Sequence, residues 1–215
     1  MVLTLGLLGL YLKERKAKMM LWSKKLMQAR GKKKANVIVV GNPTVDGFVY
    51  SGFSANNYLQ LPQEFDLGTN DFEFVIKVRM SKINSGTWEV IASSKEFNIS
   101  NINNYISFYV FDSVNGYSQE ISGQVSFNAG DVLYLKITRT EDLFRSYYSN
   151  DGMNYTMLNS LTISNTVLPK LVLKLGGSTV SNPSDFLKFY NFSGSIDLLE
   201  TYLKIEGRTV WKGVV

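Results

Sequence analysis

The chain has 215 residues, enough for one ordinary domain with a sizeable core plus an extension. Its 45% hydrophobic and 19% charged residues are typical of a folded protein, and the 13% aromatic content favours β-structure. Because it contains no Cys and no His, the sequence excludes disulfides, thiol nucleophiles, imidazole bases and the usual zinc sites.

Positive charge is concentrated at the start of the chain. Residues 1–35 carry ten basic residues and one acidic residue, whereas the remaining 180 residues carry 13 basic and 17 acidic ones. The net charge of +5 is therefore a property of the first segment and not of the rest of the chain.

The first segment is predicted to be a basic amphipathic helix followed by a linker, over residues 1–35. Apolar residues recur at the three- and four-residue spacing of a heptad seam, with Arg15 interrupting it and Gly31 placed where a helix would end. The seam residues are Leu5, Leu8, Leu12, Met19, Trp22 and Leu26. We expect this helix to anchor the protein to a partner subunit or to join copies of the chain, and a trimer is one number that the seam allows.

Two other roles of this segment, membrane binding and nucleic-acid binding, are not expected. The apolar run Val2–Leu12 is about half the ~20 residues of a membrane span, although a basic helix lying on a membrane surface is an alternative. Ten positive charges could neutralise phosphates, yet only Tyr11 and Trp22 are interleaved with them. Neither a membrane nor a nucleic acid is therefore predicted as a partner.

From residue 36 onward the hydrophobic period changes from 3.6 to 2, which predicts β-strands. Each apolar run is followed by a polar turn cluster, and no segment with a helical period interrupts them. The clearest runs are NDFEFVIKVRM (70–80), NNYISFYVF (103–111), DVLYLKITRT (131–140), LPKLVLKLGG (168–177) and the C-terminal NFSGSIDLLETYLKIEGRTVWKGVV (191–215). Many strands with one apolar face each predict a mainly β, antiparallel jelly-roll sandwich over residues 36–215, with Trp211 in its core.

The order of these runs resembles the concanavalin A-like lectin/glucanase fold in its laminin-G-like form. The resemblance covers residues 46–215: the opening strands in 53–80, a middle hairpin in 123–158 with its turn at 149–152, and closing strands in 189–213. By pattern, the segment GSIDL followed by a Trp-containing last strand is similar to domains of bacteriophage fibre and other virion proteins. This resemblance implies a virion location, other capsid or tail proteins as partners, and contact with host glycans.

One pair of carboxylates offers the nearest match to the catalytic motif of an enzyme. Glucanases of this fold use Glu-x-Asp-x-x-Glu on a strand, and Glu64-Phe65-Asp66 is the nearest match, without the third carboxylate and in an expected loop. We therefore expect a protein that is not an enzyme, with glycoside hydrolysis as the least favoured alternative.

Glycan binding is the stronger alternative. Tyr147, Tyr148, Asn150, Asp151 and Tyr155 lie close together in sequence at the hairpin turn, where aromatic rings and hydrogen-bonding groups could hold a sugar. For the turn itself a structural explanation is preferred, because Asn150-Asp151-Gly152 favours a tight hairpin and resembles the Asp-box turn of sialidases, which is structural there.

A second polar cluster is predicted from Asn103, Asn104, Asp112, Asn115 and Tyr117. No loop shows the ligand spacing of a Ca²⁺ site, so neither a metal nor another cofactor is expected. The main functional prediction is a non-enzymatic bacteriophage virion protein, such as a head fibre, a capsid decoration or a tail-associated protein. The alternative is a carbohydrate-binding module for host-surface glycans.

Overall fold

The computed structural model describes residues 33–81, 88–94, 97–168, 171–177 and 189–215. Residues 35–215 form one compact unit. The helix predicted over residues 1–35, and the anchor residues placed on it, lie outside the described residues except for the last positions of the linker. The described part of the chain contains no helix long and apolar enough to cross a membrane.

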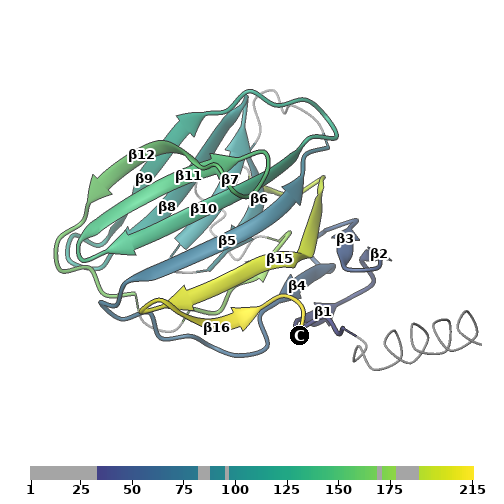
Figure 1. Cartoon of the computed structure of the whole chain (residues 1–215), viewed down its shortest axis with the longest axis horizontal. Helices are drawn as coiled ribbons and strands as arrows, with labels where there is room; N and C mark the ends of the chain where they lie inside the picture. Colours follow the sequence, from purple (N-terminus) through teal and green to yellow (C-terminus); the bar gives the residue numbers. More distant parts are fainter. Residues whose placement is uncertain (1–32, 82–87, 95–96, 169–170, 178–188) are drawn as a thin grey trace, which may run out of the picture. The chain divides into compact units, whose positions relative to one another are not determined.

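Two β-sheets lie face to face in this unit (Figure 1). In sheet 1, seven strands follow one another in space, and β14 (Phe189–Asn191) pairs in parallel with β6 on the edge that β6 also shares with β13. The seven strands, in spatial order, are β1 (Ile38–Val40), β4 (Tyr58–Gln60), β13 (Lys174–Leu175), β6 (Trp88–Ser93), β7 (Phe97–Ile102), β8 (Tyr105–Asp112) and β9 (Tyr117–Gln124).

Sheet 2 is entirely antiparallel and carries the candidate site. Its strand β16 (Arg208–Lys212) pairs with one end of the long strand β15, while β3 pairs with the other end. The strands on the main path are β12 (Thr156–Thr162), β11 (Leu143–Ser149), β10 (Val132–Thr140), β5 (Phe72–Arg79), β15 (Ser195–Ile205), β3 (Val49–Ser51) and β2 (Thr44–Asp46).

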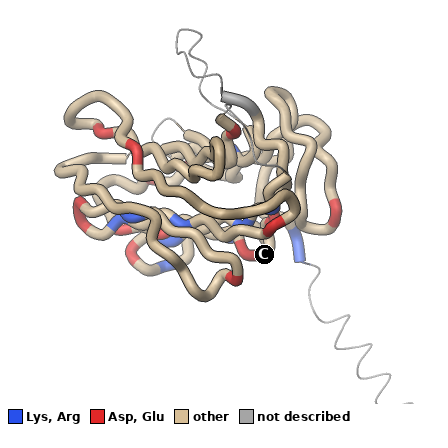
Figure 2. The backbone as a smooth tube through the Cα atoms, turned by 90° about the horizontal axis from the view of Figure 1, so that it is seen from above, with Lys and Arg blue, Asp and Glu red and all other residues tan. Residues whose placement is uncertain are grey.

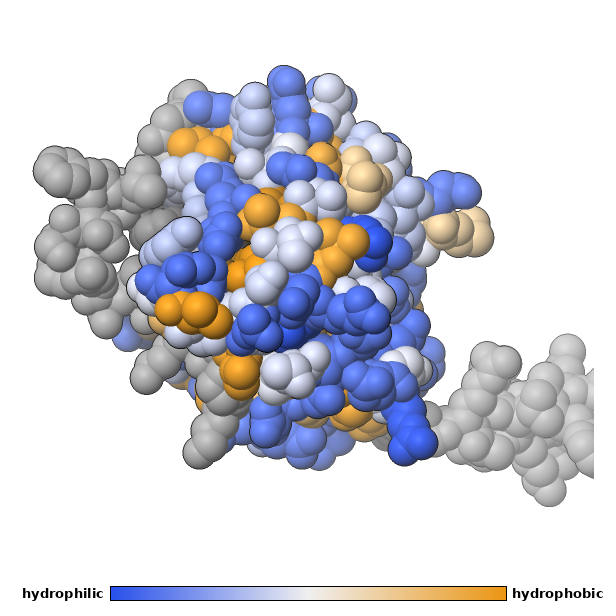
Figure 3. Space-filling model, turned by 90° about the vertical axis from the view of Figure 1, so that its left-hand side faces the viewer, coloured by the Kyte–Doolittle hydropathy of each residue, from blue (hydrophilic) through white to orange (hydrophobic). Residues whose placement is uncertain are grey.

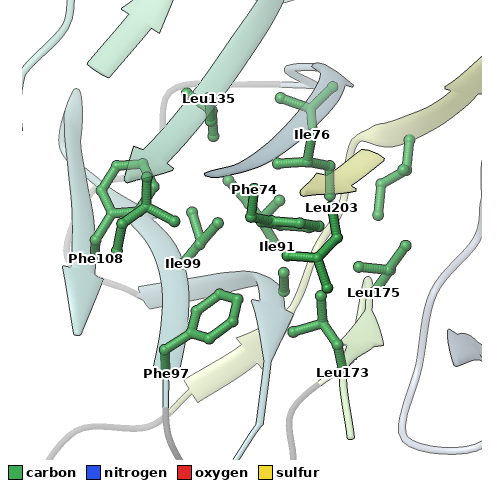
Figure 4. Packing of buried hydrophobic residues seen from close by; sticks show 14 of the residues in the cluster. Phe74, Ile76, Ile91, Phe97, Ile99, Phe108, Leu135, Leu173, Leu175 and Leu203 are labelled. Atoms are coloured by element: carbon green, nitrogen blue, oxygen red, sulfur yellow. The ribbon is translucent and has the colours of Figure 1, made fainter. Parts of the chain in front are cut away.

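The core lies between the sheets, where the alternating apolar residues meet. Figure 4 shows side chains from β5, β10 and β15 pointing toward those of β6, β7, β8 and β13. Phe72, Phe74, Ile76 and Val78 on β5, and Met80 just after it, are all buried, as their period-2 spacing predicts. The prediction of a mainly β, antiparallel jelly-roll sandwich is thereby confirmed.

The run 168–177 buries its leucines as expected but forms little regular strand. Leu171, Leu173 and Leu175 are fully buried, yet only Lys174–Leu175 is a strand, and Leu171 makes an isolated bridge to Phe65. The apolar pattern therefore identified the buried face correctly and overestimated the length of the strand.

The C-terminal residues are core material for the most part. β15 returns between β5 and β3, which confirms that the end of the chain pairs beside early strands. Trp211 is 3% exposed, so its predicted burial is confirmed. Its neighbour Val210 is 40% exposed, because neighbouring residues of a strand point to opposite faces.

Hydrophobic residues at the surface are scattered. Figure 3 looks at the left-hand end of the sandwich in Figure 1, where hydrophilic residues cover most of the face and hydrophobic ones form separate groups. Single exposed apolar residues of this kind are ordinary on folded proteins and mark no binding surface by themselves.

Candidate ligand-binding site

The outward face of sheet 2 aligns chemically active side chains across five neighbouring strands. The pairing registers join Tyr147 to Lys136, Lys136 to Val75, Val75 to Tyr202, and Tyr202 to Lys212. Directly paired residues point to the same side of a sheet, so these five form one row. The row crosses β11, β10, β5, β15 and β16 in that order.

Val75 is the floor of a hollow in the middle of this row. It is 1% exposed although it faces away from the core, and it is absent from the hydrophobic cluster between the sheets. Its burial therefore comes from side chains that stand above it on the outer face. They enclose a hollow of about 270 Å³, lined by Val75, Tyr134, Gly152, Tyr155, Leu199, Glu200, Thr201, Tyr202 and Lys212.

A bulge in β15 builds one wall of the hollow. Asp197 pairs with Lys77 and Tyr202 with Val75, so four residues, 198–201, lie opposite the single residue Ile76. The Thr201 hydroxyl holds this bulge, because it accepts a hydrogen bond from the Lys77 backbone N–H at 3.2 Å and donates one to the Asp197 carbonyl at 2.7 Å. Bulges of this kind re-aim side chains and are common beside functional sites.

Gly152 allows the turn after β11 to approach the hollow closely. Its φ is +74°, and a Cβ atom at this position would lie 2.8 Å from the ring of Tyr134. Only glycine satisfies both the positive φ and the close ring contact without displacing Tyr134.

The first polar network fixes the carboxylate of Glu200 inside the hollow. Its two oxygens accept hydrogen bonds from the Tyr134 hydroxyl at 2.7 Å and from Lys77 Nζ at 3.1 Å, and Lys77 also pairs with Asp197 at 3.0 Å. The bond from Tyr134, followed by that from Lys77, lowers the pKa of Glu200. Burial opposes the charge on Lys77, but its bonds to Asp197 and Glu200 outweigh burial and raise its pKa.

A second network closes the other side of the hollow around Glu73. Its carboxylate accepts hydrogen bonds from Lys204 Nζ at 2.7 Å and from the Tyr202 hydroxyl at 2.9 Å. Burial alone would raise the pKa of Glu73, but these two hydrogen bonds lower it overall. Burial, and then the hydrogen bond to Glu73 and the charge of Glu73, raise the pKa of Tyr202. Glu73 is therefore ionised and Tyr202 neutral near neutral pH.

Lys136 differs from Lys77 and Lys204, which are both paired with carboxylates. Its Nζ lies 3.8 Å from the ring centre of Tyr155 and 4.7 Å from that of Tyr147, at cation–π distance. In the described part of the chain it forms no ion pair with a carboxylate, and burial lowers its pKa. Burial likewise raises the pKa of Tyr155, to about 12.

Figure 2 views the molecule from above, with the front layer of Figure 1 along its lower side, where acidic and basic segments alternate.

A second hollow, of about 280 Å³, continues along this sheet. It is lined by Asp71, Phe72, Glu73, Thr138, Arg139, Thr140, Lys204 and Gly207. Since Glu73 and Lys204 come two residues from Val75 and Tyr202 on the same strands, the two hollows are neighbours.

The structure divides the five predicted glycan-binding residues among different environments. Tyr147 and Tyr155 lie on the outer face, and the rings of both are within cation–π distance of Lys136. Tyr148 was expected beside Tyr147 but packs against the core, because consecutive strand residues alternate between faces. Asn150 is exposed at the turn.

Asp151 has a structural role in the same turn. Its carboxylate accepts hydrogen bonds from the backbone N–H groups of Met153 and Asn154, from the Asn154 amide and from the Ser149 hydroxyl, all at 2.7–2.8 Å. The bonds from Asn154, then those from Met153 and Ser149, lower the pKa of Asp151. Glycan binding by these five residues stays a prediction, and only Tyr147 and Tyr155 are placed at the row.

The second predicted cluster is not brought together. Asn103 and Asn104 precede β8, whereas Asp112 ends it, so the two ends are about 23 Å apart at the rise of a strand. Asp112 is buried and organises the turn toward β9, accepting hydrogen bonds from the N–H groups of Val114 and Asn115 at 3.0 Å.

The glucanase-like pair lies elsewhere. Glu64 and Asp66 are exposed on either side of buried Phe65, outside the named strands and away from both hollows. Within the described residues no group of three or more acidic side chains is positioned to hold a metal ion.

The residues that the sequence analysis missed are those contributed by other strands. Tyr134, Lys136 and Tyr202 are all polar alternates of strands whose apolar alternates were recognised. Listing the outward residues of each predicted strand would have found them. Glu200 and Lys212 carry no such signal, because the bulge and the position of β16 arise only in the folded sheet.

Comparisons with known proteins support the fold. No family model and no curated protein matches the sequence. Among solved structures, botulinum neurotoxin type C, a toxin that depends on two ganglioside molecules to enter cells, matches with a TM-score of 0.59 and 13% identity, over 79% of this chain and 43% of the other.

Two further structures come from botulinum neurotoxin DC. Its binding domain in complex with SialylT matches with a TM-score of 0.53 and 16% identity, over 66% of this chain and 38% of the other. The same domain in complex with rat synaptotagmin II matches with a TM-score of 0.53 and 12% identity, over 76% of this chain and 43% of the other. The chain thus spans about two fifths of these proteins, and at such identities the likeness shows the fold alone.

Proposed function

We propose that this protein is a carbohydrate-binding module that holds a glycan in the hollow above Val75. The observation that carries the proposal is the set of three tyrosines, Tyr134, Tyr155 and Tyr202, that line the hollow together with Glu200. Binding sites for small polar molecules combine apolar walls with a few fixed hydrogen-bonding groups in this way.

The chemistry of the hollow suits a sugar ring. A pyranose has apolar C–H faces and a rim of hydroxyl groups, and tyrosine offers a flat apolar ring with a polar tip. The floor, Val75, is apolar, while Glu200 is held in one position by Tyr134 and Lys77. Each carboxylate oxygen retains capacity to accept a further hydrogen bond from a ligand hydroxyl.

The same geometry argues for binding rather than hydrolysis. A glycosidase needs one carboxyl group with a raised pKa to protonate the leaving oxygen. Hydrogen bonds lower the pKa of Glu200, and also that of Glu73 despite its burial, so neither carboxyl is suited to be this acid. We therefore propose that the protein is not an enzyme.

The fold similarity is consistent with a binding role. Among the toxins of similar fold, the binding domain of one is found with SialylT and with rat synaptotagmin II, and cell entry of another depends on two ganglioside molecules. Because the likeness is to the fold, it supports a role as a recognition domain without identifying the ligand.

The virion role expected from the sequence stays a prediction. The similar structures described above are toxin domains, and the N-terminal anchor lies outside the described residues. A glycan-binding domain carried on a virion by the N-terminal segment would be compatible with both the virion role and the proposed glycan binding.

The experiment is a glycan array probed with the full chain, followed by calorimetric titration of the best ligand. Tyr155→Ala should weaken binding by at least about tenfold, as loss of a central aromatic contact does. Tyr117→Ala is the matched control, because Tyr117 is 56% exposed on sheet 1 and should bind like the wild type. Absence of any glycan ligand, or full affinity in Tyr155→Ala, would refute the proposal.

A further inference from the structure

The charges around the hollow are sorted by position. On one side, Lys77 is shared by Asp197 and Glu200, so this group has one more negative charge than positive. On the other side of the hollow, Glu73 and Lys204 neutralise each other. The row between these two groups carries positive charge alone, from two lysines.

Lys212 is the first of these lysines. It lines the hollow and is the cross-strand neighbour of Tyr202. Its backbone is fixed, because its carbonyl accepts a hydrogen bond from the Asn36 amide at 3.1 Å and the preceding Trp211 is buried. Its side chain is exposed and, in the described part of the chain, has no acidic partner within ion-pair distance.

Lys136 is the second. It lies in the same row, three strand spacings or about 14 Å from Lys212, with Val75 and Tyr202 between them. Its ammonium rests against the ring of Tyr155, which itself lines the hollow. Aromatic rings stabilise a cation without neutralising its charge, so Lys136 still attracts an anion.

Two kinds of recognition are therefore combined in one site. The ionised carboxylate of Glu200 can accept hydrogen bonds but cannot donate them, so it favours ligand groups that donate, such as the hydroxyl groups of a sugar. Lys136 and Lys212 can only donate, and neither has a direct ion pair within the described residues, although the charge of Glu73 acts on Lys136, so both favour an anionic group. A ligand that satisfies both sides carries hydroxyl groups and a negative charge.

We infer that the glycan bound above Val75 is acidic, with sugar hydroxyls on Glu200 and carboxylate or sulfate groups on Lys212 and Lys136. This inference rests on the proposed function and adds the chemical class of its ligand. The spacing of about 14 Å between the two lysines suits an oligosaccharide that carries more than one acidic unit.

The test compares ligands that differ in charge alone. An oligogalacturonide and its carboxyl-reduced, neutral form are titrated against the full chain, and a sialylated and a sulfated oligosaccharide distinguish the source of the anion. The acidic form should bind at least about tenfold more tightly, and this advantage should shrink as salt is raised from about 0.01 M to about 1 M.

Variants assign the effect to the lysines. Lys212→Gln and Lys136→Gln should each weaken binding of the acidic form more than binding of the neutral form, so that most of the advantage of the acidic form is lost. Lys174→Gln is the matched control, because Lys174 also lies over a tyrosine ring, that of Tyr58, but on sheet 1. It should leave every affinity unchanged.

The outcomes separate this inference from the proposed function. If neutral and acidic glycans bind equally and Lys212→Gln has no effect, the acidic class is wrong, while sensitivity to Tyr155→Ala would still support glycan binding. If no glycan binds in any form, the proposed function fails and the inference fails with it.

Discussion

Replacing Trp211 tests how the C-terminal strand holds the sandwich together. Trp211 is 3% exposed, belongs to the hydrophobic cluster, and pairs across the sheet with buried Leu203. Its indole N–H also donates a hydrogen bond of 2.8 Å to the carbonyl of Asn36, 175 residues away in the chain. The side chain thus contributes both packing and a link between the last strand and the segment that precedes β1.

The magnitude follows from these two contributions. Truncation of a buried Trp to Ala costs about 3–5 kcal/mol, through lost apolar contact and the cavity that remains. A net contribution of about 0.5–1.5 kcal/mol within that range belongs to the hydrogen bond. Trp211→Phe keeps an aromatic ring and loses the hydrogen bond, so we expect it to cost about 1–2 kcal/mol.

Urea denaturation of the full chain is the assay. The midpoint should fall strongly for Trp211→Ala and less for Trp211→Phe, with an unchanged slope. Val210→Ala is the control, because Val210 is 40% exposed and should change the free energy of unfolding by less than about 0.5 kcal/mol. A cost below about 1 kcal/mol for Trp211→Ala would show that the strand β16 does not stabilise the core.

Three further outcomes are expected. Hydrogen bonds from Asn115, followed by those from Gln119 and Val114, lower the pKa of Asp112 from 3.8 to about 2. The stabilising effect of the ionised Asp112 is therefore full above about pH 4 and is lost as the pH falls through about 2. Denaturation midpoints measured between pH 6 and pH 2 should accordingly depend less on pH in Asp112→Ala. Deletion of residues 1–34 should leave a domain that unfolds cooperatively, and loss of cooperativity would place that segment in the core. Replacing Leu12 and Trp22 together by Asp should abolish self-association in sedimentation experiments, and a monomeric wild type would contradict the predicted oligomer.

The inner face of the sandwich was predictable because burial imposes a strict period on the sequence. In β5 every second residue from Phe72 is apolar and buried, and the same holds in β8 and β10 up to the last inward position, where Asp112 and Arg139 are buried instead. Since a shift of one residue would expose the whole apolar set, the pattern also specifies which face each strand turns inward. It carries no comparable information on which strands are neighbours.

The site was only partly predictable for that reason. Proximity in sequence grouped Tyr147 with Tyr148, although the pleat separates them, and it could not join Lys136 to Tyr202, which are 66 positions apart along the chain and two strands apart in the sheet. The bulge in β15 is marked in the sequence only by a shift of the apolar residues from even positions, Ile196 and Leu198, to odd ones, Leu203 and Ile205. This shift does not say which residues lie opposite it. Only the pairing registers bring these side chains to one hollow.

The hollow is also separable from the stability of the domain, which makes its variants interpretable. Tyr155, Lys136 and Lys212 lie on the outer face, and none of them belongs to the hydrophobic cluster between the sheets. Val75 is the one fully buried hydrophobic residue of the hollow, and it too lies outside that cluster. Loss of binding in Tyr155→Ala or Lys212→Gln would therefore reflect a lost ligand contact, provided that the denaturation midpoint is unchanged. The bulge explains how one strand serves both purposes: Leu198 turns inward and is buried, while Glu200, two residues later, reaches the hollow.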